Sequence, residues 1–307
     1  MIASLTKILL AIDGSREAAL AVRAAAEVSR MTGAELHVVH VIPEVSSPSH
    51  PTSTMFADYT RLAEEDAGNL LRKLAWTARV DGGEVSGEHL RVGKPAQEIN
   101  ALATQLDADL VVIGSPRAGW LKRLIAGSVA EDLVHGASCP VLIVRGGENA
   151  WPPPKIVVGD DGSEAAERAG ILAAEIASLY GVEVVLMRAY QNPPEPVGGW
   201  SAQDRHELDE ALSRRREDLD GRAERVAALT QSRTETRLIE TKAASAVSRQ
   251  AGKSGGESTL LAVGSRGLGA FDRVLSGSVS TDVLRAAVGP VLVVPSEKGF
   301  GLADGDD

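Results

Sequence analysis

The sequence predicts an α/β protein of two similar doubly wound domains, each an open five-stranded parallel sheet with helices on both faces, Rossmann-like in architecture. Three observations predict this. Short apolar runs alternate with helical segments, and the whole series occurs twice. Only ten of the 307 residues are Phe, Trp or Tyr, while Ala, Val and Leu abound, which suits thin parallel strands covered by helices. The length itself suits two domains better than one core.

The first half shows each element in order. An apolar strand at residues 7–12 is followed by a helix with a small-residue face, which Gly33 ends. Pro95 opens a later helix at a position where its missing N–H costs little. The other expected elements are strands at Glu35–Ile42, Val85–Val92, Asp109–Ile113 and Val141–Val144, and helices at about Asp58–Thr77 and Ser128–His135.

The same order then repeats. KILLAIDGS begins at residue 7 and KIVVGDDGS at residue 155, while GSV occurs at 127 and 277, and PVLIV at 140 is echoed by PVLVV at 290. A repeat of this length means two similar domains. We expect a first domain at 1–146, a Gly- and Pro-rich linker at 147–154, a second domain at 155–297 and a flexible tail at 298–307.

Composition excludes several classes of function. A net charge of −10 argues against a broad basic surface for nucleic acid or an anionic membrane. Cys139 is the only cysteine, so no intrachain disulfide is possible and a reducing compartment is expected. Apolar runs are too short for a membrane helix, and the N-terminus lacks a signal-peptide pattern. The expected location is therefore cytoplasmic.

One stretch carries most of the chemistry. The strand at Leu260–Val263 is followed by Gly264, Gly267 and Gly277, and then by Ser278, which opens a helix over Val279–Ala287. Glycines after a strand let the backbone approach a ligand, and the unpaired N–H groups of a helix start favour an anion. The loop lacks the Lys of a GxxxxGK[ST] phosphate site. The pattern therefore favours phosphate binding over a structural turn with an ordinary helix cap.

The motifs together resemble the universal stress protein family over nearly the whole chain, and the two copies resemble its tandem members. They are DGS at 13–15, VGKPA at 92–96, VIGS at 112–115, GSV at 127–129 and PVLIV at 140–144. The resemblance implies an adenine nucleotide alpha hydrolase-like fold that binds ATP or AMP, with or without Mg. It also implies a stress-response regulatory role through a signalling partner not yet known, and no settled catalytic reaction. The last strands would pair the domains as a pseudo-dimer, and a homodimer is possible.

The resemblance also assigns site residues, with no catalytic residue and no metal ligand among them. In the second domain they are Asp161, Ala189, Val263, Gly264, Ser265, Arg266, Gly267, Gly277, Ser278, Val279 and Ser280. In the first domain they are Asp13, Val41, Ile113, Gly114, Ser115, Arg117, Gly127, Ser128 and Val129.

The two halves depart from the pattern differently. Arg117 replaces the glycine that corresponds to Gly267, so its Cβ and restricted φ would hinder the loop, although its guanidinium could instead contact phosphate. In the second half Thr241 replaces the glycine corresponding to Gly93, and Thr259 replaces Asp109. We expect the second domain to hold the stronger site.

Simpler interpretations stay open. Asp13 and Asp161 are as well explained by turns that cap the next helix as by contacts to ribose or metal-bridged phosphate, and the charge-rich helix Asp204–Arg225 is interpreted as a solvated face over Leu208, Leu212 and Leu219. A structural or interaction module with decayed sites is one alternative. A weak ATPase or adenylating enzyme is another, but the sequence has neither an SGGxDS-type loop nor a catalytic Lys–His signature near the phosphates. Separately, no Cys or His cluster has zinc spacing.

Overall fold

The structure, a computed structural model, describes residues 5–44, 54–115, 129–241, 259–265 and 279–296. The strands of these residues form one ten-stranded sheet in the order β3-β2-β1-β4-β5-β10-β9-β6-β7-β8. Its strands are β1 (Lys7–Ile12), β2 (Glu35–Ile42), β3 (Val85–Val92), β4 (Leu110–Gly114), β5 (Val141–Val144), β6 (Lys155–Gly159), β7 (Glu183–Tyr190), β8 (Thr234–Glu240), β9 (Leu260–Gly264) and β10 (Val291–Val294).

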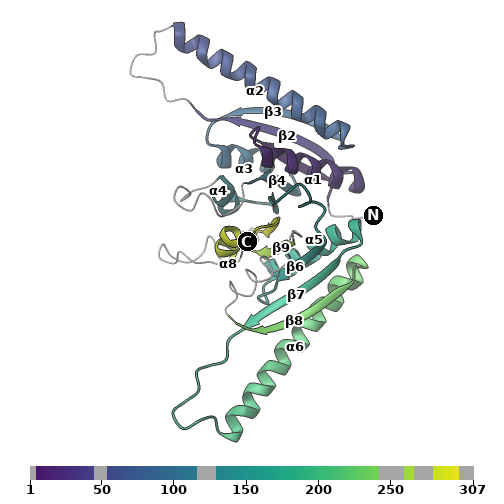
Figure 1. The fold of residues 1–307 in the computed structure, drawn as a ribbon, viewed down its shortest axis with the longest axis vertical. Helices are drawn as coiled ribbons and strands as arrows, with labels where there is room; N and C mark the ends of the chain where they lie inside the picture. The colour runs from purple at the N-terminus through teal and green to yellow at the C-terminus, as the bar shows by residue number, and fades with distance from the viewer. Residues whose placement is uncertain (1–4, 45–53, 116–128, 242–258, 266–278, 297–307) are drawn as a thin grey trace, which may run out of the picture.

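Helices cover both faces of this sheet, as the predicted α/β class requires. They are α1 (Arg16–Thr32), α2 (Thr54–Val80), α3 (Pro95–Leu106), α4 (Val129–Gly136), α5 (Glu164–Tyr180), α6 (Ala202–Thr230) and α8 (Val279–Ala286). One face packs against α1, α2, α5 and α6, and the other against α3, α4 and α8. We call these the α1 face and the α3 face. In Figure 1, α2 and α6 lie at opposite ends of the molecule.

The two halves join through their last strands. All strands within a half are parallel, but β5 and β10 pair antiparallel, with Leu142 opposite Leu292. Both leucines are fully buried. Across the same seam, Arg285 donates to a carboxylate oxygen of Glu131 at 3.0 Å, and Arg145 Nη1 donates to the carbonyl of Leu284 at 2.6 Å. The expected pairing of the domains through these strands is therefore confirmed within the chain.

Local sequence explains where the helices begin and end. The hydroxyls of Ser15 and Ser163 accept hydrogen bonds from the first turns of α1 and α5, and left-handed Gly33 and Gly181 end these helices. The helix α2 is longer at both ends than the expected Asp58–Thr77. Its last turn continues because Ala78 is buried in the core on the α1 face.

The segment between the halves is packed rather than loose. Trp151 is 4% exposed, its indole meets the ring of Tyr180 edge-on, and its Nε1 donates to the Tyr180 hydroxyl at 3.0 Å. Burial raises the pKa of that phenol above its usual range. None of the helices in the described part of the chain combines the length and apolar character needed to cross a membrane.

Candidate functional site

In each half, the predicted site residues that the structure describes lie at the carboxyl ends of that half's parallel strands. Because β9, β6 and β7 are adjacent and parallel, their carboxyl ends lie together. This edge therefore carries Asp161, Ala189 and Val263–Ser265, and the matching edge of the first half carries Asp13, Val41 and Ile113–Ser115. The apolar members Val41, Ile113, Ala189 and Val263 all lie on the α3 face.

Several predicted site residues lie outside the described residues. They are Arg117, Gly127, Ser128, Arg266, Gly267, Gly277 and Ser278. Of the helix starts that follow these loops, Val129 is the exposed first residue of α4, while Val279 and Ser280 begin α8. The glycine-loop prediction and the comparison of Arg117 with Gly267 therefore stay predictions.

Asp13 and Asp161 each form a turn that leads into the next helix. In the second half Asp161 Oδ1 accepts from the backbone N–H of Ser163 at 2.9 Å, and the Ser163 hydroxyl caps Ala166 N at 3.2 Å. Asp13 and Ser15 repeat this arrangement. The simpler interpretation of both aspartates, a capping turn, is confirmed. Both carboxylates are exposed at the sheet edge, which leaves room for a ligand contact as well.

Gly114 and Gly264 are required by packing. A Cβ on Gly264 would lie 2.7 Å from the backbone N of Ala166, and one on Gly114 would lie 2.5 Å from the backbone of Glu17. These glycines let the ends of β9 and β4 approach the first turns of α5 and α1. A structural role thus accounts for both residues, independently of any bound phosphate.

Ser265 also has a structural partner. Its side chain is buried, its N–H donates to the carbonyl of Val294 at 2.8 Å, and its hydroxyl accepts from the N–H of Ser296 at 3.0 Å. The matching N–H of Ser115 donates to the carbonyl of Val144. These contacts tie the strand that precedes the glycine loop to the strand at the seam.

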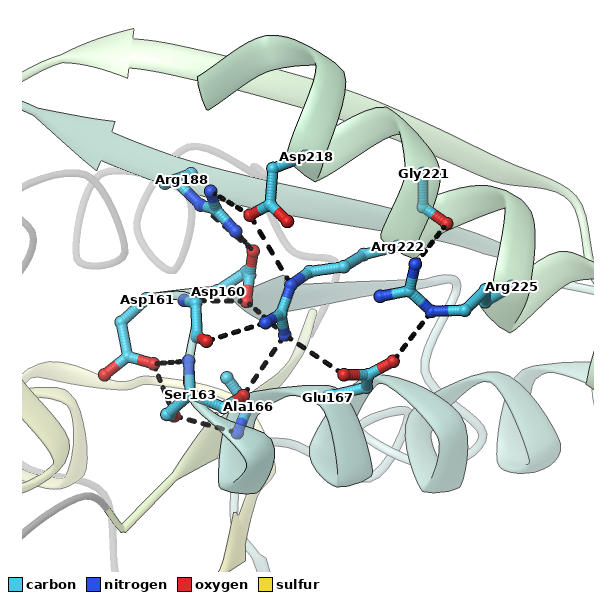
Figure 2. Close-up of polar contacts among 11 residues, drawn as sticks. Asp160, Asp161, Ser163, Ala166, Glu167, Arg188, Asp218, Gly221, Arg222 and Arg225 are labelled. Atoms are coloured by element: carbon cyan, nitrogen blue, oxygen red, sulfur yellow. Dashed lines mark hydrogen bonds and ion pairs between the residues drawn. The ribbon is translucent and has the colours of Figure 1, made fainter. Parts of the chain in front are cut away.

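A cluster of charged side chains lies beside the Asp161 turn, and the sequence reasoning missed it (Figure 2). We call it the arginine cluster; its members are Asp160, Glu167, Arg188, Asp218, Arg222 and Arg225. Arg188 forks between Asp160 and Asp218, and its hydrogen bond to Asp218 is 2.7 Å long. Arg225 donates to Glu167 at 2.9 Å. The carboxylate of Asp160 is only 2% exposed.

The charges of the cluster stabilise one another. Burial alone would lower the pKa of Arg188, but hydrogen bonds and attraction from Asp218 and Asp160 outweigh it and raise the pKa. The hydrogen bond from Arg188 lowers the pKa of Asp218. Arg188 and Asp218 therefore stay charged across the physiological range.

The interpretation of the second-half helix as a solvated face was only partly right. Leu219 is buried in the core, but Leu208 and Leu212 are only half-buried. Arg222, on the same helix, turns inward to the cluster with 12% of its side chain exposed. A comparison of the two repeats could have indicated this cluster, because Asp160 and Arg222 stand where the first half has Ile12 and Leu74.

Other chemistry is sparse. Over the described ranges, no group of three or more His, Cys, Asp or Glu residues could hold a metal ion. A groove of about 520 Å³ between the halves is lined by Cys139, Arg168 and Leu172 among others. None of the predicted site residues that the structure describes lines it, but Ser296, which does, donates to Ser265. Burial, with help from Asp109 and Asp107, raises the pKa of the Cys139 thiol to about 12, so it is a poor nucleophile.

Comparison with known proteins decides the family. The sequence model of the Universal stress protein family matches the chain twice, at residues 4–145 and 153–295. The chain belongs to the universal stress protein family. A universal stress protein of Mycolicibacterium smegmatis is 31% identical over 296 residues, covering 94% of this chain and 96% of its own length. Universal stress protein Rv2623 of Mycobacterium tuberculosis is 30% identical over 297 residues, covering 93% and 95%.

The fold agrees with solved members of the family. The crystal structure of a universal stress protein from Archaeoglobus fulgidus covers 94% of this chain and 98% of its own, with a TM-score of 0.68 and 20% identity. At that identity the likeness shows the fold. The chain is thus a tandem universal stress protein with the predicted Rossmann-like architecture.

Proposed function

We propose that this universal stress protein binds adenine nucleotide, ATP or AMP, at the carboxyl edge of its parallel strands and acts as a stress-response regulator. The observation that carries the proposal is the convergence of Asp161, Ala189 and Val263–Ser265 at one edge, beside the start of α5. Ligands of doubly wound sheets bind at this edge, where the strand order reverses.

The edge suits the parts of a nucleotide. Ala189 is small and half-buried on the α3 face, which leaves space for a flat base. The exposed Asp161 carboxylate can accept a hydrogen bond from a ribose hydroxyl. Any Mg²⁺ would arrive with the phosphates, because proteins hold it through one or two carboxylates together with substrate phosphates.

We propose two domains, at 1–146 and 155–297, and place the stronger nucleotide site in the second. It includes a cytoplasmic setting, an unidentified signalling protein as partner and a possible homodimer. The reason for the asymmetry is Gly267, for which the first half has Arg117. A non-Gly residue held in an unfavourable backbone region costs about 1–3 kcal/mol, or one to two powers of ten in affinity.

A second candidate is an interaction module that binds no nucleotide. It is favoured by the structural roles of Gly264, Ser265 and the Asp161 turn, each of which needs no ligand.

Denaturing the purified protein and separating the released small molecules distinguishes the two candidates. Release of ATP or AMP near one equivalent per chain supports the first, and a preparation that is empty and gives no heat on titration with ATP supports the second. Steady formation of ADP or pyrophosphate would instead indicate an enzyme.

A further inference from the structure

We propose that Asp160 and Arg222 are positioning residues for the nucleotide site of the second half. They act through the turn that carries Asp161. This inference rests on the proposed function and adds to it the residues that hold the site in shape.

The turn is held from two sides. Asp160 Oδ1 accepts the N–H of Gly162 at 3.1 Å, which fixes the turn at the end of β6. Arg222, from α6, donates through Nη2 to the carbonyl of Gly162 at 2.6 Å and through Nη1 to the carbonyl of Ser163 at 3.2 Å. The guanidinium thus donates hydrogen bonds to the backbone carbonyls of Gly162 and Ser163, the two residues that directly follow Asp161 (Figure 2).

The rest of the arginine cluster keeps this guanidinium in place. Nitrogen atoms of Arg222 lie 3.6 Å from Asp160, 3.5 Å from Glu167 and 3.6 Å from Asp218, so carboxylates of the turn after β6, of α5 and of α6 surround the guanidinium. Arg188 ties two of these carboxylates together. A side chain with 12% exposure and this many charged neighbours has little freedom to leave the turn.

The first half shows that the fold does not need the cluster. At the positions that correspond to Asp160, Arg188, Asp218 and Arg222, it has Ile12, His40, Leu70 and Leu74. There His40 Nδ1 is hydrogen-bonded to the carbonyl of Ile12 at 2.7 Å, and Leu70 packs against Gly14. In the first half, Leu70 therefore lies against the turn, and the described part of the chain shows no guanidinium bonded to the carbonyls of Gly14 and Ser15.

The difference between the halves indicates that the arginine cluster fixes the geometry of the nucleotide site. Burying charges is costly, and replacing a buried ion-pair network by apolar residues is often neutral or stabilising. A turn that is already fixed loses less conformational freedom when a ligand binds, which improves affinity. The cluster thus favours a pre-organised Asp161 in the second half.

A double-mutant cycle in ATP affinity tests the inference. We expect Arg222→Leu to weaken binding about three- to tenfold, since ordering a loop on binding costs on this scale. Asp161→Ala should weaken binding as well. If Arg222 acts through the turn, the double variant binds no more weakly than Asp161→Ala alone. Leu74→Ala, at the corresponding position of the first half, is the matched control and should leave this affinity unchanged.

A second variant separates positioning from folding. This four-residue variant carries the corresponding residues of the first half: Asp160→Ile, Arg188→His, Asp218→Leu and Arg222→Leu. It should keep the melting temperature of the wild type and still bind ATP more weakly than the wild type. Arg222→Lys, which can donate to a carbonyl, should restore part of the loss. Additive effects in the cycle, or wild-type affinity in either Arg222→Leu or the four-residue variant, would overturn the inference. A wild-type chain that binds no ATP would end the proposed function and this inference with it; wild-type binding that only Asp161→Ala weakens would end this inference alone.

Discussion

Gly264→Ala tests whether close packing, and not a ligand, fixes the glycine at the end of β9. The new Cβ would lie 2.7 Å from Ala166 N, 2.8 Å from the Ala165 carbonyl carbon and 2.9 Å from its Cβ. Ordinary contacts of this kind begin near 3.4 Å, so α5 and β9 must separate by roughly 0.7 Å. Because the contacts are mostly backbone, no rotamer change relieves them. Overpacking of this kind costs about 1–3 kcal/mol.

Urea denaturation followed by circular dichroism measures this cost, with Gly170→Ala as the control. A Cβ on Gly170, in the middle of α5, would meet only Val226 at 3.5 Å and Val158 at 3.9 Å, so the gain in helix propensity should stabilise the protein by up to about 1 kcal/mol. The two alanine substitutions should therefore move the free energy of unfolding in opposite directions. If Gly264→Ala is as stable as the wild type, the packing argument is wrong.

Three further predictions concern the seam, a histidine pair and the thiol. Leu142→Ala should destabilise the protein by about 2–5 kcal/mol in urea denaturation, because this buried side chain lies at the seam opposite Leu292; a loss below 1 kcal/mol would contradict its role. Burial, the adjacent His37 and Arg91 lower the pKa of His89. The neutral imidazole therefore contributes stability above pH 6.5 that is lost as the pH falls through the lowered pKa. The melting temperature of His89→Gln should depend less on pH in this range than that of the wild type, and an unchanged dependence would contradict the assignment. Cys139 should react slowly with a disulfide reagent at pH 8 and faster toward its pKa of about 12, whereas fast reaction at pH 8 would show an exposed thiolate.

The sheet could be predicted from the sequence closely. Four strands, β1, β2, β3 and β5, match their expected bounds. Short parallel strands of Val, Ile and Leu leave little ambiguity, because they are bounded by Gly, Pro and Asp, which do not continue a strand. The pairing of β5 with β10 was an expectation from the family resemblance, and it agrees with the rule that an apolar strand at a sheet edge is usually covered.

The arginine cluster could not be predicted as easily. Arg222 lies on a helix rich in both charges, where single-sequence patterns cannot tell an inward arginine from a solvated one. Its partner Asp160 directly follows β6, and Arg188, which binds Asp160 in turn, lies on β7; both are distant from Arg222 in the sequence, so only the fold brings them together. Comparing the two repeats position by position would have exposed the cluster, because charged residues replace apolar ones at Ile12 and Leu74.

Isothermal titration of ATP into the wild type, Asp161→Ala and Asp13→Ala tests the central claim most directly. Both aspartates accept the same backbone hydrogen bond in a turn at corresponding strand ends, so each variant removes the corresponding carboxylate from its half. We predict that the wild type binds ATP, that Asp161→Ala loses most of this binding and that Asp13→Ala keeps it. A wild type without measurable binding, or a loss confined to Asp13→Ala, would contradict a nucleotide site in the second half.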